Sequence, residues 1–211
     1  MTRSTATPAQ LADELLAMLR IRWESHTLQP RVIGVAGESG SGKTHTASRL
    51  AEACNAAGVH TVVLHLDNYF ILPPGTNHEH RHDNLAHVGP HEVNMPLLAE
   101  HITAFRARSS NVLAPLVDYS GNRFVEQSFD FSAAELLIVE GTYALQLDQL
   151  DVRIFLTATH EDNAERRRLR ARDLDAPFIA QVLAIEHAII AKQAAIADIL
   201  INDQFQIVRT V

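Results

Sequence analysis

Cysteine and aromatic residues are scarce in this chain of 211 residues: Cys54 is its single cysteine, and aromatic residues make up 6% of it. One cysteine excludes an internal disulfide, and we expect Cys54 to be a small buried hydrophobic side chain. Long apolar runs are missing too, since none approaches the roughly 20 residues of a membrane span. The opening residues are polar and form no signal peptide. We therefore expect a cytoplasmic protein with no membrane partner.

Positive charge is also in short supply, because 18 lysines and arginines stand against 25 acidic residues and leave a net charge of −7. A general nucleic-acid binder needs a basic face, so we expect no nucleic-acid partner. The chain has the length of one domain and can bury a substantial core. We therefore expect a single domain over residues 1–211.

A glycine-rich segment at residues 37–44, GESGSGKT, is the strongest signal present. It matches G-x-x-x-x-G-K-[ST], a loop whose backbone N–H groups wrap the phosphates of a nucleotide. Residues 31–36 before it predict a buried strand and residues 44–53 after it a helix, which is the arrangement that supports such a loop. Lys43 would reach the β- and γ-phosphates, and the Thr44 hydroxyl would hold Mg²⁺. The predicted nucleotide-binding residues are Gly37, Glu38, Ser39, Gly40, Ser41, Gly42, Lys43 and Thr44.

Strands and helices alternate along the rest of the chain. An N-terminal helix lies within residues 1–30, and its capping box begins at Thr7. Further helices are expected at 92–108, 161–173 and 177–197, and strands at 61–66, 111–118, 136–139, 152–156, 199–201 and 205–208. This order predicts an α/β fold, a mostly parallel sheet with helices on both faces. Residues 70–94 lack periodicity and predict a functional loop, and residues 112–131 predict a hairpin, both on the side of the acceptor.

Two carboxylates follow predicted strands, where ligands of open α/β sheets bind. Asp67 ends the strand at 61–66, and Glu140 follows the apolar run at 136–139. Phosphoryl transfer needs charge neutralisation, Mg²⁺ placement and an oriented acceptor hydroxyl. We expect Glu140 to be a metal ligand through water, and Asp67 to accept the proton of the attacking hydroxyl or to help hold Mg²⁺.

Arginines crowd residues 166–173, RRRLRARD. Guanidinium groups bind phosphate oxygens in a bidentate way, so this segment, within 161–176, predicts a lid that closes over the transferring phosphate. The competing interpretation is a solvated basic face paired with the acidic residues one turn earlier. For the lid we assign catalytic roles to Arg166 and Arg170, and nucleotide contacts to Arg168 and Arg172.

Histidines gather in the segment at 70–94, at positions 78, 80, 82, 87 and 91. Imidazole is a good metal ligand, but neither a HExxH nor a Cys/His zinc pattern is present. We therefore favour contact with the substrate over a metal role and select His87 as the preferred residue.

Taken in order, the motifs resemble the uridine kinase/phosphoribulokinase group of P-loop kinases. They are residues 37–44, Asp67 with Tyr69 and Phe70, residues 115–119, Glu140 with Gly141, and residues 166–173. The resemblance implies a five-stranded parallel core, ATP and Mg²⁺ as donor and metal, a small hydroxyl compound as acceptor, and Asp67 as the base. It also implies that residues 84–87 line the ribose side. The substrate contacts expected on this basis are Tyr69, His87, Asp118, Tyr119 and Asn122.

Three positions depart from the pattern of that group. Val117 stands where a nucleoside-contacting tyrosine is expected, Asn122 where a histidine is expected, and Ala86 where an aspartate is expected. Loss of a stacking aromatic and a ribose-binding carboxylate weakens nucleoside binding. A uridine- or cytidine-like nucleoside is therefore the nearest family substrate, and pantothenate, glycerate or a sugar phosphate is the alternative.

Two other functions share the phosphate-binding loop. A GTPase that delivers a metal would use the histidine segment for its cargo, but the chain has no Asn-Lys-x-Asp motif for reading guanine. A binding protein without catalysis would not need intact Lys43, Thr44, Asp67 and Glu140. The predicted C-terminal strands leave a sheet edge that a second copy could pair with, so a homo-oligomer stays open.

Overall fold

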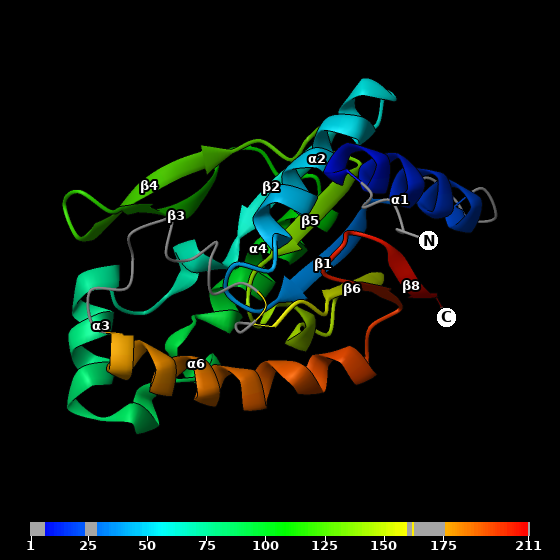
Figure 1. Cartoon of the computed structure of the whole chain (residues 1–211). Coiled ribbons are helices and arrows are strands. Elements are labelled where there is room, and N and C mark those ends of the chain that lie inside the picture. Colours follow the sequence, from blue (N-terminus) through cyan, green and yellow to red (C-terminus); the bar gives the residue numbers. More distant parts are fainter. Residues whose placement is uncertain (1–6, 24–28, 160–161, 163–175, 211) are drawn as a thin grey trace, which may run out of the picture.

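The computed structural model describes residues 7–23, 29–159, 162 and 176–210 (Figure 1). A six-stranded sheet forms its centre in the order β2-β5-β1-β6-β7-β8. The strands pair in parallel except the last, which is antiparallel to β7. They span Arg31–Gly37 (β1), Thr61–His65 (β2), Leu136–Glu140 (β5), Val152–Leu156 (β6), Ile199–Ile201 (β7) and Ile207–Thr210 (β8). The predicted α/β architecture is therefore confirmed, with β8 added at the edge; pairing of that edge with a second copy stays a prediction.

Helices cover both faces of the sheet (Figure 1). The helices α1 (Pro8–Trp23) and α2 (Lys43–Ala56) lie together on one face, and α4 (Met95–Arg106) lies on the other. The capping box that starts α1 is formed as predicted: the backbone N–H of Thr7 donates to Oε1 of Gln10 at 2.8 Å, and the Gln10 N–H donates to the Thr7 hydroxyl at 3.3 Å.

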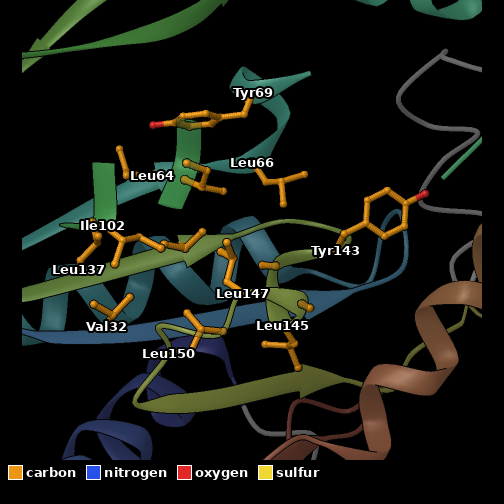
Figure 2. Packing of buried hydrophobic residues seen from close by; sticks show 14 of the residues in the cluster. Val32, Leu64, Leu66, Tyr69, Ile102, Leu137, Tyr143, Leu145, Leu147 and Leu150 are labelled. Atoms are coloured by element: carbon orange, nitrogen blue, oxygen red, sulfur yellow. The ribbon is translucent and has the colours of Figure 1, made fainter. Parts of the chain in front are cut away.

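The alternation of side chains along β1 divides the core between the two faces. Val32 and Ala36 join a cluster with α4, whereas Ile33 and Val35 join a second cluster with α1 and α2. Figure 2 shows the first cluster, in which leucines after β5 fill the space over Val32. Cys54 is fully buried in the second cluster, as expected, and burial raises the pKa of its thiol.

A helix in the segment at 70–94 corrects the prediction of a loop. Here α3 runs over Pro74–Asp83 and begins with a proline at its first position. No apolar stripe marks this helix, because it is held by polar and aromatic contacts at a spacing of four residues. Asn77 and Arg81 both donate to Glu92, while the rings of His78 and His82 contact Phe178.

The predicted hairpin is present as β3 (Val112–Asp118) and β4 (Arg123–Phe129), a separate two-stranded sheet that projects from the domain (Figure 1). Its turn is joined to the start of α3, because the backbone N–H of Gly75 donates to Oδ1 of Asn122 at 2.7 Å. Next to the turn, the N–H of Val117 donates to Oδ1 of Asn68 at 3.0 Å. The hairpin is thereby held beside the segment that follows β2.

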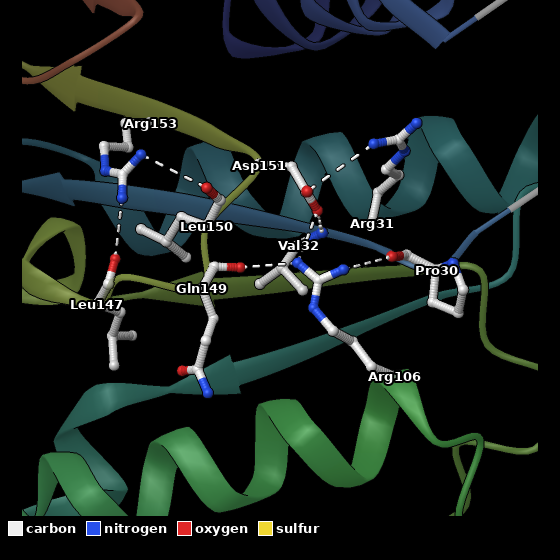
Figure 3. A network of polar contacts seen from close by, with 9 residues as sticks. All are labelled: Pro30, Arg31, Val32, Arg106, Leu147, Gln149, Leu150, Asp151 and Arg153. Atoms are coloured by element: carbon white, nitrogen blue, oxygen red, sulfur yellow. Dashed lines mark hydrogen bonds and ion pairs between the residues drawn. The ribbon is translucent and has the colours of Figure 1, made fainter. Parts of the chain in front are cut away.

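A polar network closes the amino end of the sheet (Figure 3). Oδ2 of Asp151 accepts from the backbone N–H of Val32 at 2.7 Å and from Arg106 at 3.1 Å. Arg106 also donates to the carbonyl oxygens of Pro30 and Gln149. These bonds connect the entry of β1 with the end of α4 and the loop before β6, at the edge opposite the glycine-rich loop.

The predicted lid helix, with its arginines, lies outside the described residues. The last helix, α6, spans Ala176–Ile190 and continues as a 3₁₀ segment, Ala191–Ala195. By length and composition alone, Pro177–Ala195 is long and apolar enough to cross a membrane, with 22% of its 18-residue window buried, although Glu186 and Lys192 interrupt its apolar residues. The same stretch bonds to the domain: Glu186 lies 3.1 Å from Arg81, and Nδ1 of His187 lies 2.6 Å from Glu38.

Candidate nucleotide and acceptor site

The glycine-rich loop connects the carboxyl end of β1 to the first residue of α2, Lys43. Gly42 precedes the helix with φ of 99°, a left-handed conformation that favours glycine, and a Cβ there would meet the Phe205 ring at 2.9 Å. The Ser41 side chain is buried, and its hydroxyl has no hydrogen-bond partner among the described residues. The strand, loop and helix therefore form the anion-binding arrangement that the motif predicts.

A cavity of about 360 Å³ opens beside this loop. It is lined by residues from the loop, the segment after β2, α3, the hairpin turn and α6; these are Ser39, Gly40, Lys43, Thr44, Asp67, Phe70, Leu72, Pro74, Asn77, Arg81, Tyr119, Thr142, Ile179, Val182, Leu183 and Glu186. Lys43 and Asp67 thus face one space, although they belong to different strand–helix units. Asp67 is exposed at the carboxyl end of β2, where it lies in a short 3₁₀ turn.

Glu140 lies at the carboxyl end of β5, between β1 and β2, and joins their two functional segments. Its Oε1 accepts from the Thr44 hydroxyl at 3.1 Å and lies 2.7 Å from Nδ1 of His65. The second carboxylate oxygen is buried without a hydrogen-bond partner among the described residues. The hydrogen bond to Glu140 raises the pKa of His65, against the opposing effect of burial. Sequence reasoning missed His65, which stands two residues before Asp67.

Glu38 is not among the residues that line the cavity. Its side chain is buried, with an oxygen 2.6 Å from Nδ1 of His187 on α6. The loop is therefore connected to the helix that forms the apolar wall of the cavity. His187 carries no motif, so only the packing of α6 could bring it to Glu38.

A second polar group, also missed by sequence reasoning, contributes Arg81 and Glu186 to the lining of the cavity. Arg81 makes two hydrogen bonds to Glu92 and a third contact to Glu186 at 3.1 Å. Burial disfavours the charged form of Arg81, but the hydrogen bond to Glu92 and the charges of Glu186 and Glu92 outweigh it and raise its pKa. Burial raises the pKa of Glu186 despite the charge of Arg81. The spacing of Asn77 and Arg81 by four residues is the only sequence signal for this group.

The predicted substrate contacts are spread over different environments. Tyr119 lines the cavity. Tyr69 is instead buried in the core, its hydroxyl 2.7 Å from Nδ1 of His101, because the 3₁₀ turn after β2 points it inward. Asp118 accepts hydrogen bonds from Ser120, Gly121 and Arg123 within the hairpin turn. Asn122 bonds to α3, and His87 stacks on His80 at 3.5 Å between ring centroids. None of these last four is among the residues that line the cavity.

The remaining predicted residues are the lid arginines and the histidines. Arg166, Arg168, Arg170 and Arg172 lie outside the described residues. Across the part of the chain that the structure describes, no three His, Cys, Asp or Glu side chains gather where they could hold a metal. The histidines of α3 make ring contacts with one another and with Phe178.

The fold and the loop geometry together define a P-loop protein, a class in which the phosphate-binding loop joins a buried strand to a helix. The family follows from the sequence. The chain belongs to the Phosphoribulokinase / Uridine kinase family, whose model matches residues 32–176.

Individual relatives agree with this assignment. A uridine kinase from Macrococcus caseolyticus is 30% identical over 151 residues, which cover 68% of this chain and 69% of the relative. A uridine kinase from Staphylococcus aureus is 29% identical over 187 residues, which cover 82% of this chain and 87% of the relative. The solved structure of a possible uridine kinase from Bacillus stearothermophilus has a TM-score of 0.65 at 17% identity and covers 90% of this chain and 98% of that one, which shows the shared fold. The protein is thus a phosphotransferase of this family.

Proposed function

We propose that this kinase transfers the γ-phosphoryl group of ATP to a hydroxyl group of a small molecule that binds between Asp67 and the P-loop. The observation that carries the proposal is that Lys43, Thr44 and Asp67 line one cavity. Transfer of a phosphoryl group requires the attacking oxygen, the phosphorus and the leaving oxygen to lie roughly in line. A single cavity that contains both the phosphate-binding lysine and a carboxylate provides room for that alignment.

The P-loop supplies the nucleotide side of this reaction. Its backbone N–H groups would bind the phosphate oxygens, and Lys43 would offset charge on the β- and γ-phosphates. Arg166 and Arg170 are proposed to offset charge on the transferring group, and Arg168 and Arg172 to contact the nucleotide. These four roles rest on the arginine pattern and the resemblance alone.

The residues behind the loop fit a Mg²⁺ ion. The Thr44 hydroxyl and the Glu140 carboxylate are hard oxygen ligands, and one Glu140 oxygen is buried without a hydrogen-bond partner among the described residues. Thr44 would bind the ion directly and Glu140 through water. When bound, Mg²⁺ neutralises charge on the phosphates. His65 orients the Glu140 carboxylate from the opposite side.

Asp67 is the proposed base. Its carboxylate would accept the proton of the acceptor hydroxyl as that oxygen attacks the γ-phosphorus. The exposed position of Asp67 at the end of β2 leaves it accessible to an acceptor that enters the cavity.

A uridine- or cytidine-like nucleoside is the nearest family acceptor, and the names of the relatives support it. Tyr119 supports it too, because an exposed aromatic ring at the cavity edge can stack on a base. Val117 is buried and does not line the cavity, so no aromatic ring occupies the position expected for a nucleoside contact. An acceptor without a base is the alternative. No observation on the described residues favours the metal-delivering GTPase.

The test is a kinase assay with ATP consumption as readout, run against uridine, cytidine, pantothenate, glycerate and sugar phosphates. We expect Lys43→Ala to abolish turnover. Asp67→Asn should lower kcat by about 10²–10⁴-fold and leave the affinity for ATP nearly unchanged, because a general base acts only in the chemical step. Asp83→Asn, an exposed carboxylate of α3, is the control. Equal losses of kcat and ATP affinity in Asp67→Asn would contradict the role of base.

A further inference from the structure

Arg81 and Glu186 line the cavity, and together with Glu92 they form one polar group. Arg81 is the only cationic side chain among the described lining residues of the cavity apart from Lys43. Both Glu92 and Glu186 bind it, with Nη2 at 2.8 Å from Glu92 Oε2 and 3.1 Å from Glu186 Oε1. One guanidinium therefore serves two carboxylates, and the group carries net negative charge when both are ionised.

The two carboxylates differ in what else they bind. Glu92 also accepts from the amide of Asn77 at 2.9 Å and from the backbone N–H of Gly89 at 2.7 Å, so its oxygens are well satisfied. Glu186 lines the cavity, and its side chain is 13% exposed. Lys43 lines the same cavity, and its charge acts on the Glu186 carboxylate. Glu186 is therefore the carboxylate that a molecule in the cavity would meet.

The charged residues of the cavity wall select by charge. An acceptor with a phosphate or carboxylate would place another anion beside the Glu186 and Asp67 carboxylates, with Arg81 already shared by two acids. An acceptor hydroxyl can instead donate a hydrogen bond to a carboxylate. The side chains of Ile179, Val182 and Leu183 would cover the carbon skeleton of such a molecule.

We infer that Glu186 is a specificity-determining residue that, together with Arg81, selects an uncharged hydroxyl-bearing acceptor and rejects acceptors that carry phosphate or carboxylate. This inference rests on the proposed function and narrows it. Uncharged ribosides, sugars and polyols remain as acceptors, whereas glycerate, pantothenate and sugar phosphates do not.

The test compares matched pairs that differ in one anionic group: ribose with ribose 5-phosphate, glycerol with glycerate, and pantothenol with pantothenate. Binding to the full chain is measured by calorimetry with Mg²⁺ and a non-hydrolysable ATP analogue, and turnover is measured separately with ATP. We expect the uncharged member of a pair to bind at least tenfold more tightly. Equal or tighter binding of the anionic members overturns the inference. Turnover of anionic acceptors would overturn it while the proposed function stands, and binding without turnover of any acceptor would count against the proposed function alone.

A substitution of Glu186 tests whether this residue causes the preference for uncharged acceptors. Glu186→Gln keeps the volume of the side chain and an oxygen for Arg81, so it should raise KM for the uncharged acceptor about tenfold and narrow the preference within each pair by a similar factor. The kcat and the KM for ATP should change little. Glu79→Gln, an exposed residue of α3, is the matched control. An unchanged preference in Glu186→Gln, or a loss of kcat alone, overturns the assignment.

Discussion

The hydroxyl of Tyr69 and the imidazole of His101 form a buried polar pair, with the oxygen 2.7 Å from Nδ1. His101 is 6% exposed, and burial lowers its pKa, although the charge of Glu100 and a backbone hydrogen bond at Leu113 oppose this. The folded protein therefore binds a proton at His101 less readily than the unfolded chain does, whose histidines titrate near about 6.5. Tyr69, which was expected to contact substrate, is instead the buried partner of a histidine that contributes to the pH dependence of stability.

The first prediction concerns this pair. As pH falls through about 6.5, the unfolded state takes up a proton that the folded state resists, so the free energy of unfolding decreases toward acid. The slope from one such group is at most about 1.4 kcal/mol per pH unit. In urea unfolding, the free energy of unfolding of His101→Gln should decrease less between pH 7 and pH 5 than that of the parent protein. His60→Gln, at an exposed position, should retain the slope of the parent protein; identical slopes for all three proteins would rule out His101 as the source.

At the scale of elements, α3 and the hairpin depend on each other. The tip of the hairpin is bonded to α3 through Asn122, which accepts from Gly75 and donates to Thr76 at 3.2 Å. Tyr119, in the same turn, lines the cavity. The position of one cavity wall is thus set by two hydrogen bonds between elements that are each too small to be stable alone.

The second prediction follows from that connection. Asn122 has φ of 45°, so Asn122→Gly keeps the turn and removes only the bonds to α3. We expect it to destabilise the hairpin by about 1 kcal/mol, to raise its sensitivity to limited proteolysis, and to raise KM for the acceptor several-fold while KM for ATP stays constant. Asn122→Asp keeps the oxygen that accepts from Gly75. Its stability and its KM for the acceptor should therefore lie between those of the parent protein and those of Asn122→Gly. A rise in KM for ATP of the same size would show that the hairpin does not act on the acceptor specifically.

At the scale of the whole molecule, the two ends of the sheet carry different tasks. The carboxyl end holds the P-loop, Asp67 and Glu140, whereas Asp151 and its arginines hold the amino end together (Figure 3). Asp151 accepts a hydrogen bond from the backbone N–H of Val32, and Val32 is fully buried. Stability and catalysis are therefore separable by mutation at the two ends.

The third prediction tests this separation. Asp151→Ala leaves the Val32 N–H without its acceptor and Arg106 without its carboxylate, so the free energy of unfolding should fall by about 2 kcal/mol. For a chain of this size Tm should fall by roughly 4–8 °C. The affinity for ATP at a temperature well below Tm should not change. Asp148→Ala, an exposed acid in the same loop, is the control. A loss of ATP affinity in the folded variant would contradict the separation of the two ends.

The sequence alone determined the P-loop, the order of strands and helices and the positions of Asp67 and Glu140. These features are local: the eight residues from 37 to 44 contain the whole loop, and an apolar run followed by an acid marks a strand end. The capping box of α1 and the β3–β4 hairpin were predictable for the same reason, since their contacts join residues close together in the chain.

Only the tertiary structure decided which side chains meet in the cavity. Arg81 and Glu186 are separated by more than a hundred positions, and neither belongs to a motif. The helix α3 has no apolar stripe to announce it, because its stabilising partners, Glu92 and Phe178, come from other segments. Tyr69 and Asn122 were assigned to the substrate by motif order, but packing directs one into the core and the other toward α3. Backbone propensity and hydrophobic periodicity specify elements, whereas long-range contacts form only when those elements pack together.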